Sequence, residues 1–213
     1  MKRLASAAIV LVSCGFTGCL VKDTSHTLYL SPDGSVVWSV LERDVRSAEE
    51  DGSKRWNEER QFLDGVVSGR HPIDLGLQAL GAERTSVRLL RAERPYAVLT
   101  DARFARIDRV IQSFFDALRL DGRASLEWSG SRATLWVTLD IPEDESAAGD
   151  GHDTPIASLV DDLDRYRIVL TDGEFAAAEG FEILENGSQA KLTVAEGDAA
   201  RRRIELRLTW PAR

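Results

Sequence analysis

The chain has 213 residues, with 27 basic and 35 acidic side chains and a formal charge of −8 at pH 7. A chain of this length can bury a sizeable core, whereas its acidic excess disfavours binding to nucleic acid or anionic lipid through the net electrostatic field. Both of its two cysteines lie within the first 19 residues, so we expect no disulfide in the folded body.

The N-terminus is typical of an export signal. Residues 1–3 form a basic head, and no charged side chain follows between Leu4 and Val21. Export signals combine such a head with an apolar core of roughly 7–15 residues and with small residues where a peptidase cleaves. The pattern therefore predicts that residues 1–18 are removed and that the remaining chain is exported.

The signal ends in Phe16-Thr17-Gly18-Cys19, which resembles the lipobox of bacterial lipoprotein (type II) signal peptides. Phe16 stands where that motif usually has leucine. The resemblance covers only residues 1–19, and it implies that cleavage follows Gly18 and that Cys19 becomes an acylated N-terminus carrying diacylglycerol. Because Leu20 rather than aspartate follows the cysteine, the resemblance favours the outer membrane, facing the periplasm, in an organism that has one.

Two alternatives to this signal stay open. Residues 11–14, Leu-Val-Ser-Cys, also match the lipobox, but cleavage before Cys14 would leave a short apolar core for an export signal. The other alternative is an uncleaved membrane anchor over Leu4–Val21, slightly shorter than the ~20 apolar residues that span a bilayer. In each case the basic head stays cytoplasmic and the body is exported.

Removal of the signal makes the body more acidic. Residues 1–18 hold two of the 27 basic residues and none of the 35 acidic ones, so 25 basic and 35 acidic residues remain, a formal charge of −10. We therefore expect no nucleic-acid partner. The expected partners are the membrane, reached through acylated Cys19, and an envelope protein or a lipid.

Hairpins dominate the first two thirds of the body. Apolar runs around the turn Ser31-Pro32-Asp33-Gly34 predict a hairpin that begins at His26 and ends at Glu42. Further strand pairs are expected over Thr85–Arg91 with Tyr96–Thr100, and over Arg123–Trp128 with Ala133–Ile141.

Helices are expected between these hairpins. A capping-box spacing at residues 47–50 precedes a stripe at helical spacing, in which Glu59 is the polar exception among Trp56, Phe62, Leu63, Val66 and Val67. A short helix is expected over Ile73–Leu80. The clearest amphipathic helix, capped by Thr100 or Asp101, carries Phe104, Ile107, Ile111, Phe114, Phe115 and Leu118.

The acidic, turn-rich residues 142–155 are expected to form a solvated loop or hinge. A short helix over residues 156–163 and four strands follow, at Tyr166–Thr171, Phe181–Leu184, Ala190–Ala195 and Arg203–Trp210. The pattern predicts an α+β fold, a mostly antiparallel sheet of hairpins with about three to four helices packed on one face. We expect a lipidated tether over residues 19–25 and then one domain over 26–213, with a candidate sub-lobe boundary at 142–155.

Few groups for catalysis are present. The three histidines are His26, His71 and His152, and the nearest approach to a metal-ligand cluster, Asp150-Gly151-His152-Asp153, is expected to be an exposed acidic loop. The carboxylate pair Glu58-Glu59 is expected on a solvated helix face. Neither a G-x-S-x-G elbow nor a glycine-rich phosphate loop occurs. We therefore expect no enzymatic activity, no metal and no cofactor.

Two basic groups and the tryptophans are the other features that could bind a ligand. The basic groups are Arg84, Arg88, Arg91 and Arg94, and residues 201–203. In so acidic a body, we expect these guanidinium groups to pair with nearby carboxylates. Trp38, Trp128 and Trp136 lie in predicted strands, where they would stack on one sheet face, as core or as the wall of a ligand groove.

Three functions are open on this evidence. The leading hypothesis is a non-catalytic binding or assembly module of the cell envelope, held by Cys19, which predicts an exposed apolar or aromatic patch. The second is a carrier of a lipid or other apolar ligand, with an open cavity between the sheet and the helix over residues 104–118. The third is an envelope hydrolase, which needs a cleft that gathers His71 or His152 with carboxylates.

Overall fold

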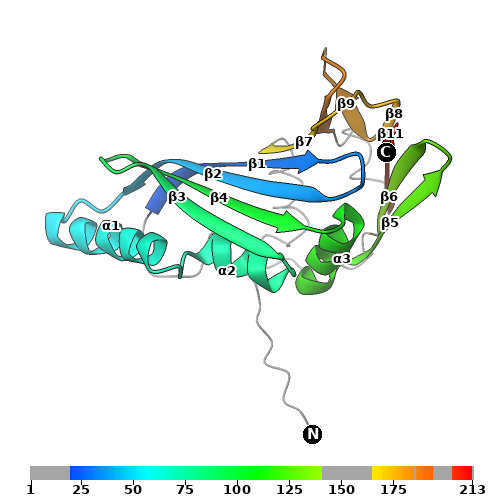
Figure 1. Cartoon of the computed structure of the whole chain (residues 1–213). Helices are drawn as coiled ribbons and strands as arrows, with labels where there is room; N and C mark the ends of the chain where they lie inside the picture. Colours follow the sequence, from blue (N-terminus) through cyan, green and yellow to red (C-terminus); the bar gives the residue numbers. More distant parts are fainter. Residues whose placement is uncertain (1–19, 141–164, 185, 194–202, 213) are drawn as a thin grey trace, which may run out of the picture.

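The computed structural model describes residues 20–140, 165–184, 186–193 and 203–212. The predictions for Cys14, Gly18 and Cys19, for the loop at 142–155 and for the helix at 156–163 lie outside the described residues. Within the described ranges the chain is a mixed α+β fold with two mostly antiparallel sheets and three helices. Figure 1 shows the helices along one side of the larger sheet and the smaller sheet across its end.

The larger sheet has seven strands in the order β3-β4-β2-β1-β7-β10-β9. They are β1 (Leu20–Leu30), β2 (Val36–Ser47), β3 (Arg84–Arg91), β4 (Tyr96–Phe104), β7 (Tyr166–Leu170), β9 (Phe181–Ile183) and β10 (Gln189–Leu192). Neighbouring strands are antiparallel except β1 and β7, which run parallel with His26 opposite Tyr166 and Leu28 opposite Ile168.

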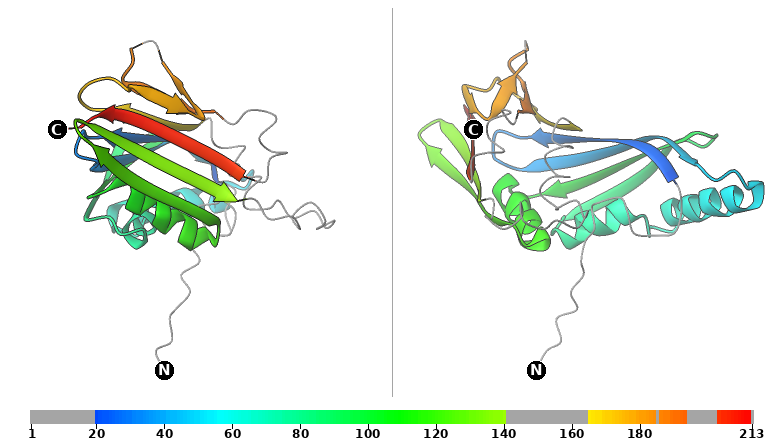
Figure 2. Two further views of the ribbon diagram at one scale, coloured as in Figure 1. Left: turned by 90° about the vertical axis from the view of Figure 1, so that its right-hand side faces the viewer. Right: turned by 180° about the vertical axis from the view of Figure 1, so that it is seen from behind.

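The smaller sheet has four antiparallel strands in the order β5-β6-β11-β8. They are β5 (Asp121–Ser129), β6 (Arg132–Asp140), β8 (Ala177–Glu179) and β11 (Arg203–Pro211). Figure 2 shows β5, β6 and β11 side by side across the end of the molecule. The hairpins were predicted correctly, but they divide between two sheets where one was expected.

The strand β1 begins earlier than predicted. Residues 20–25, expected to be a tether, pair with β2, and Leu20 lies opposite Ser47. A register shift between Val21 and Asp23 marks a β-bulge in this pairing. The folded sheet therefore extends back to the residue that follows Cys19.

Helix α1 (Gly52–Val67) begins with a different cap from the one predicted. The carboxylate of Asp51 accepts hydrogen bonds from the backbone N–H groups of Ser53 and Lys54, at 2.8 and 3.0 Å. Such bonds satisfy donors that have no partner inside the helix. Ser47, the predicted cap, belongs instead to β2.

Helices α2 (Pro72–Ala79) and α3 (Ile107–Leu118) follow. The prediction for α3 placed its start too early, because Phe104 and both predicted caps, Thr100 and Asp101, lie in β4. The N-cap residue, Arg106, makes no side-chain cap hydrogen bond. Instead the backbone N–H of Ile107 donates to the carbonyl of Gly34, at 2.9 Å, which fixes α3 against the β1–β2 turn.

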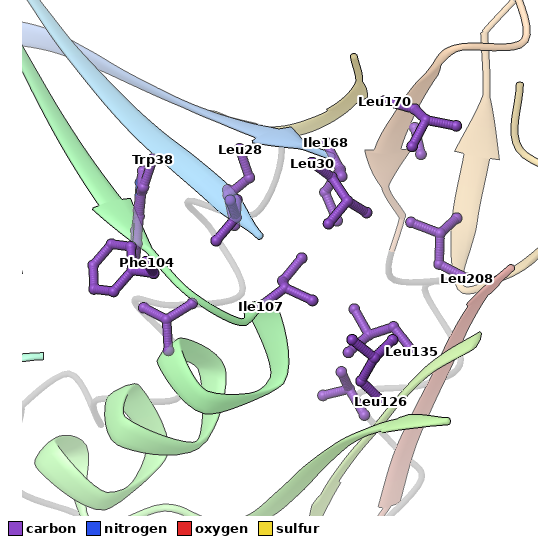
Figure 3. Close-up of a cluster of buried hydrophobic side chains, with 14 of the residues drawn as sticks. Leu28, Leu30, Trp38, Phe104, Ile107, Leu126, Leu135, Ile168, Leu170 and Leu208 are labelled. Carbon is purple, nitrogen blue, oxygen red and sulfur yellow. The ribbon is translucent and has the colours of Figure 1, made fainter. Parts of the chain in front are cut away.

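One hydrophobic core joins both sheets and α3. Figure 3 shows Leu28, Leu30 and Trp38 of the larger sheet facing Leu126, Leu135 and Leu208 of the smaller one, with Ile107 of α3 between them. At the edge of this core, the indole N–H of Trp210 donates to the carbonyl of Pro32, at 3.3 Å. The sheets are therefore held together through the β1–β2 turn.

Candidate functional site: an apolar cavity between the two sheets

An apolar cavity of about 160 Å³ lies beside this core, among the larger sheet, α3 and the smaller sheet. Its lining residues are Leu28, Trp38, Val110, Ile111, Phe114, Phe115, Leu135, Val137, Leu139, Tyr166, Ile168, Phe181, Leu192, Ile204 and Leu206. The wall that these residues form is apolar throughout. The cavity expected between the sheet and the helix is therefore present, with a second sheet as an additional wall.

Local periodicity explains how each element contributes to this wall. Along β6, Leu135, Val137 and Leu139 are buried while Trp136 is exposed, because successive side chains of a strand point to opposite faces. On α3, Val110 and Phe114 are four residues apart and lie on one side of the helix. Both elements thus turn their apolar faces toward the space between the sheets.

The volume limits what the cavity can hold. An engineered cavity of ~150 Å³ lined by aliphatic and aromatic side chains stays dry and binds benzene. Pockets for drug-sized ligands are larger, roughly 300–1,000 Å³. A cavity of about 160 Å³ therefore matches one short alkyl segment or a single ring rather than a whole two-chain lipid.

A polar group adjoins the cavity where Trp38 and Tyr166 form its wall. The indole Nε1–H of Trp38 donates to Nδ1 of His26, at 3.2 Å. The imidazole also stacks on the ring of Tyr166, with centroids 4.4 Å apart and planes 6° from parallel. Because Nδ1 accepts this hydrogen bond, the proton of a neutral His26 must be on Nε2.

The surroundings of His26 favour its neutral form. Burial is the main cause that lowers the pKa of His26 to about 4; Glu42 opposes the shift, and the charges of Arg165 and Lys22 add to it. At neutral pH the imidazole is therefore uncharged. The cavity is thus bordered by a neutral aromatic stack.

A second buried group lies between the larger sheet and α2. Glu42 and His71 are each 1% exposed, and Nε2 of His71 lies 2.9 Å from Oε2 of Glu42. The ammonium of Lys22 lies 2.6 Å from the other carboxylate oxygen. Burial alone would raise the pKa of Glu42, but the hydrogen bond from His71 and the charge of Lys22 outweigh it and hold the pKa below its ordinary value.

This group meets one requirement of the hydrolase hypothesis, since it gathers His71 with carboxylates. Asp74, on the first turn of α2, is buried as well, and the buried atoms without a hydrogen-bond partner include Nδ1 of His71, Oδ1 of Asp74 and Oγ1 of Thr100. All these side chains are enclosed rather than open to solvent. Within the described ranges, no group of three or more His, Cys, Asp or Glu side chains could hold a metal ion.

Three of the four arginines between residues 84 and 94 pair with carboxylates as predicted, whereas no ion pair of Arg84 is found among the described residues. Arg88 lies 2.8 Å from Asp101, Arg94 lies 2.8 Å from Glu59, and Arg91 lies 3.3 Å from Asp44. Arg203 lies 2.8 Å from Glu205, whereas residues 201 and 202 are outside the described ranges.

The three tryptophans expected on one sheet face are separated. Trp38 is in the larger sheet and lines the cavity, whereas Trp128 and Trp136 are exposed on the smaller sheet. The guanidinium of Arg207 covers the ring of Trp136, 5.2 Å from its centroid, which is within the range of a cation–π contact. Only Trp38 of the three therefore belongs to the site.

A larger depression, about 520 Å³, opens at the edge of the smaller sheet. It is lined by Gln112, Asp121, Gly122, Arg123, Thr138, Asp140 and Arg203. Two carboxylates and two guanidinium groups balance each other's charge there. Its lining is mainly polar, so the apolar cavity between the sheets is the better candidate for a binding site.

Sequence reasoning missed part of the cavity wall. The alternation in β6 was visible and would have placed Leu135, Val137 and Leu139 on one face. Nothing local indicated that β7 pairs with β1, so Tyr166 and Ile168 could not be assigned to the same wall as Leu28.

No described helix is long and apolar enough to cross a membrane. Neither a family model nor a curated protein sequence matches the chain. Among solved structures, the chain is similar to the folded domain of LppM from Mycobacterium tuberculosis, determined by NMR, with a TM-score of 0.40 and 12% sequence identity over 94% of each chain. So low a similarity supports no conclusion about function.

Proposed function

We propose that the chain is an exported lipoprotein of the cell envelope whose folded body binds the apolar part of a lipid or lipid-like molecule. The observation that carries the ligand class is the partly open cavity of about 160 Å³ with its apolar wall. The lipobox-like residues 16–19 support the membrane anchor. The role is non-catalytic, and the ligand is held rather than transformed.

The size of the cavity favours reversible binding of a single chain. Burial of a methylene contributes about 0.8 kcal/mol, so a segment of about six carbons gains roughly 5 kcal/mol. Association itself costs on the order of 4 kcal/mol or more. The cavity alone therefore leaves only a small net free energy of binding, so the rest of the ligand must also contact the protein for binding to be saturable, and such a ligand would still exchange readily.

The polar end of such a ligand would remain outside the apolar wall. His26 and Tyr166 adjoin the cavity as a stacked pair, and both carry polar atoms. A neutral imidazole can donate one hydrogen bond from Nε2 without placing a charge beside the chain. The site thus favours an amphiphile with an uncharged or weakly polar group next to its alkyl segment.

The ligand class is tested on the full-length protein, purified from bacterial membranes in a detergent that is distinguishable by mass. Organic extraction and mass spectrometry should recover, together with the protein, a non-covalently bound molecule that carries at least one alkyl chain. Recovery of detergent alone, with no saturable uptake of added single-chain amphiphile, would contradict the proposed binding.

The anchor is tested separately by intact mass. Wild-type chain expressed in a bacterial host should lose residues 1–18 and gain diacylglycerol, while Cys19→Ser should not. If Cys14→Ser rather than Cys19→Ser prevents the modification, the lipobox is the one at residues 11–14. An unprocessed wild type would overturn the anchor and leave the cavity proposal untouched.

A further inference from the structure

Strand β1 starts next to the proposed anchor, so its first residues mark the end of the larger sheet that lies nearest to it. Leu20 is the first residue of β1, and it follows Cys19 directly. Consecutive Cα atoms are 3.8 Å apart, so no flexible stalk separates the acylated residue from the sheet. If Cys19 is acylated, as proposed above, this end of the sheet lies at the lipid surface.

Helix α1 is fixed to that same end. Leu20 lies opposite Ser47 in the β1–β2 pairing. The backbone N–H of Ser47 donates to Oε1 of Glu59, at 3.0 Å, and its hydroxyl donates to Oε2 of Glu58, at 2.5 Å. Both glutamates belong to α1, and Figure 1 shows this helix beside the start of β1.

The solvent face of α1 differs from the rest of the acidic body. Trp56 is 58% exposed, and the guanidinium of Arg60 covers its ring at 5.0 Å. Lys54 is exposed on the preceding turn, whereas Glu58 and Glu59 turn inward to Ser47. Trp56 and Arg60, four residues apart, thus share one outer side of the helix, whereas Lys54, two residues before Trp56, lies nearly opposite, on the side of Glu58.

We propose that α1 lies against the lipid surface, with Trp56 in the headgroup region and Arg60 toward the lipid phosphates. An amphipathic indole prefers the boundary between apolar and aqueous phases, and long basic side chains can reach headgroups from an adjacent position. Anionic lipid attracts such side chains locally even when the protein as a whole is acidic. The acidic Asp64, 3.7 Å from Arg60, limits the basic face to the first half of the helix.

The smaller sheet lies at the other end of β1 from Leu20. It packs against the β1–β2 turn, at the opposite end of β1, through the bond from Trp210 to Pro32. An eleven-residue strand at ~3.3 Å per residue spans about 33 Å. Trp136, exposed on that sheet, is therefore a matched control for Trp56.

The test uses the lipidated full-length protein in vesicles of phosphatidylethanolamine and phosphatidylglycerol that contain brominated phosphatidylcholine. Bromine near the headgroups quenches tryptophan fluorescence only at short range. Wild type, Trp56→Phe and Trp136→Phe are compared, after intact mass and circular dichroism have shown that all three are lipidated and folded.

We expect wild type and Trp136→Phe to be quenched alike and Trp56→Phe to lose most of the quenching. Equal quenching of wild type and Trp56→Phe would overturn the proposed surface. The proposal is also overturned if aqueous acrylamide quenches Trp56 equally with and without vesicles, because α1 would then face water. If the mass measurement shows no lipidation, the anchor itself is contradicted. If the protein is lipidated but Trp56 is not quenched, only the lipid-facing surface of α1 is contradicted, so the two failures are distinguishable.

Discussion

The indole N–H of Trp38 donates a hydrogen bond to Nδ1 of His26, at 3.2 Å, at the border of the apolar cavity. The two residues lie on neighbouring strands, and the ring of Tyr166 on β7 stacks against the same imidazole. A proton added to Nδ1 would remove the acceptor of this bond. The wall of the cavity is therefore coupled to the protonation state of one histidine.

Acidification should destabilise the protein through His26. Its pKa is lowered from 6.5 to about 4 in the folded chain, so between these values the unfolded state binds a proton that the folded state does not. Stability is therefore full above pH 6.5 and falls as the pH decreases toward 4, by on the order of 3 kcal/mol in total. Denaturant unfolding at pH 7 and pH 5 measures the effect, and His26→Gln should show a smaller difference between the two. An equal difference in both proteins would show that other groups cause it.

Glu42 should contribute to stability in a lower pH window. Because its folded pKa is below the ordinary value, the contribution is present above the unfolded pKa of 4.5 and is lost as the pH falls below it. At pH 7, Glu42→Ala should cost about 3–5 kcal/mol, since it leaves Lys22 and His71 without their partner.

A double-mutant cycle checks the pairing of Glu42 with His71. His71→Ala should cost less in the Glu42→Ala protein than in the wild type, because the pair is already broken there. The measurement is chemical unfolding of the four proteins at one pH. Strictly additive losses would contradict the coupling between the two side chains.

A comparison of Gly34→Ala with Gly130→Ala should separate the cost of backbone strain from the cost of a steric clash between the two sheets. Gly34 has φ +83°, and a Cβ there would come within 2.5 Å of Cδ2 of Leu126 on the smaller sheet. Gly130 is a hairpin glycine with φ +58°, and a Cβ on it would meet nothing within 4 Å, so Gly130→Ala incurs only the backbone cost, about 1–2 kcal/mol. We expect Gly34→Ala to cost about 1–3 kcal/mol more than this control. Equal costs in thermal unfolding would show that Leu126 moves aside freely.

Helix α1 offers a test of which of its faces is structural. Glu59 is 7% exposed and accepts from the backbone of Ser47 and from Arg94, at 3.0 and 2.8 Å. Glu59→Ala should therefore cost about 2–4 kcal/mol, because it leaves these donors unpaired. Trp56→Ala should change the free energy of unfolding by no more than about 0.5 kcal/mol, as for other exposed side chains. A larger loss at Trp56 than at Glu59 would reverse this assignment of the two faces.

Local contacts explain what could be predicted from the sequence. The β1–β2 hairpin closes over a short turn, so proline, aspartate and Gly34 suffice to indicate it. The apolar spacing along α3 likewise identified the helix and the face it buries. The predicted start of α3 was wrong because Phe104 continues the alternation of β4. The ring of Phe104 would be buried in a strand as well as in a helix.

Remote contacts explain what could not be predicted. The parallel pairing of β1 with β7 joins segments more than a hundred residues apart, so neither strand indicates the other. On α1, apolar spacing suggested that Val67 and Trp56 face the core, yet Val67 is 82% exposed. The buried residues of α1 are Val66, as predicted, and Glu59, whose partners Ser47 and Arg94 are supplied by segments that the helix sequence cannot reveal.

The most direct test of ligand binding fills the cavity. Val137 lines it from β6, whereas Trp136, the preceding residue, points to the outside. Dansyl-labelled undecanoic acid is titrated into the wild type, Val137→Phe and Trp136→Phe, and its fluorescence is followed. We predict saturable binding to the wild type and Trp136→Phe and a loss of at least about tenfold in affinity for folded Val137→Phe, equivalent to about 1.4 kcal/mol. Unchanged affinity in Val137→Phe, or no saturable binding to the wild type, would contradict a chain-binding cavity between the two sheets.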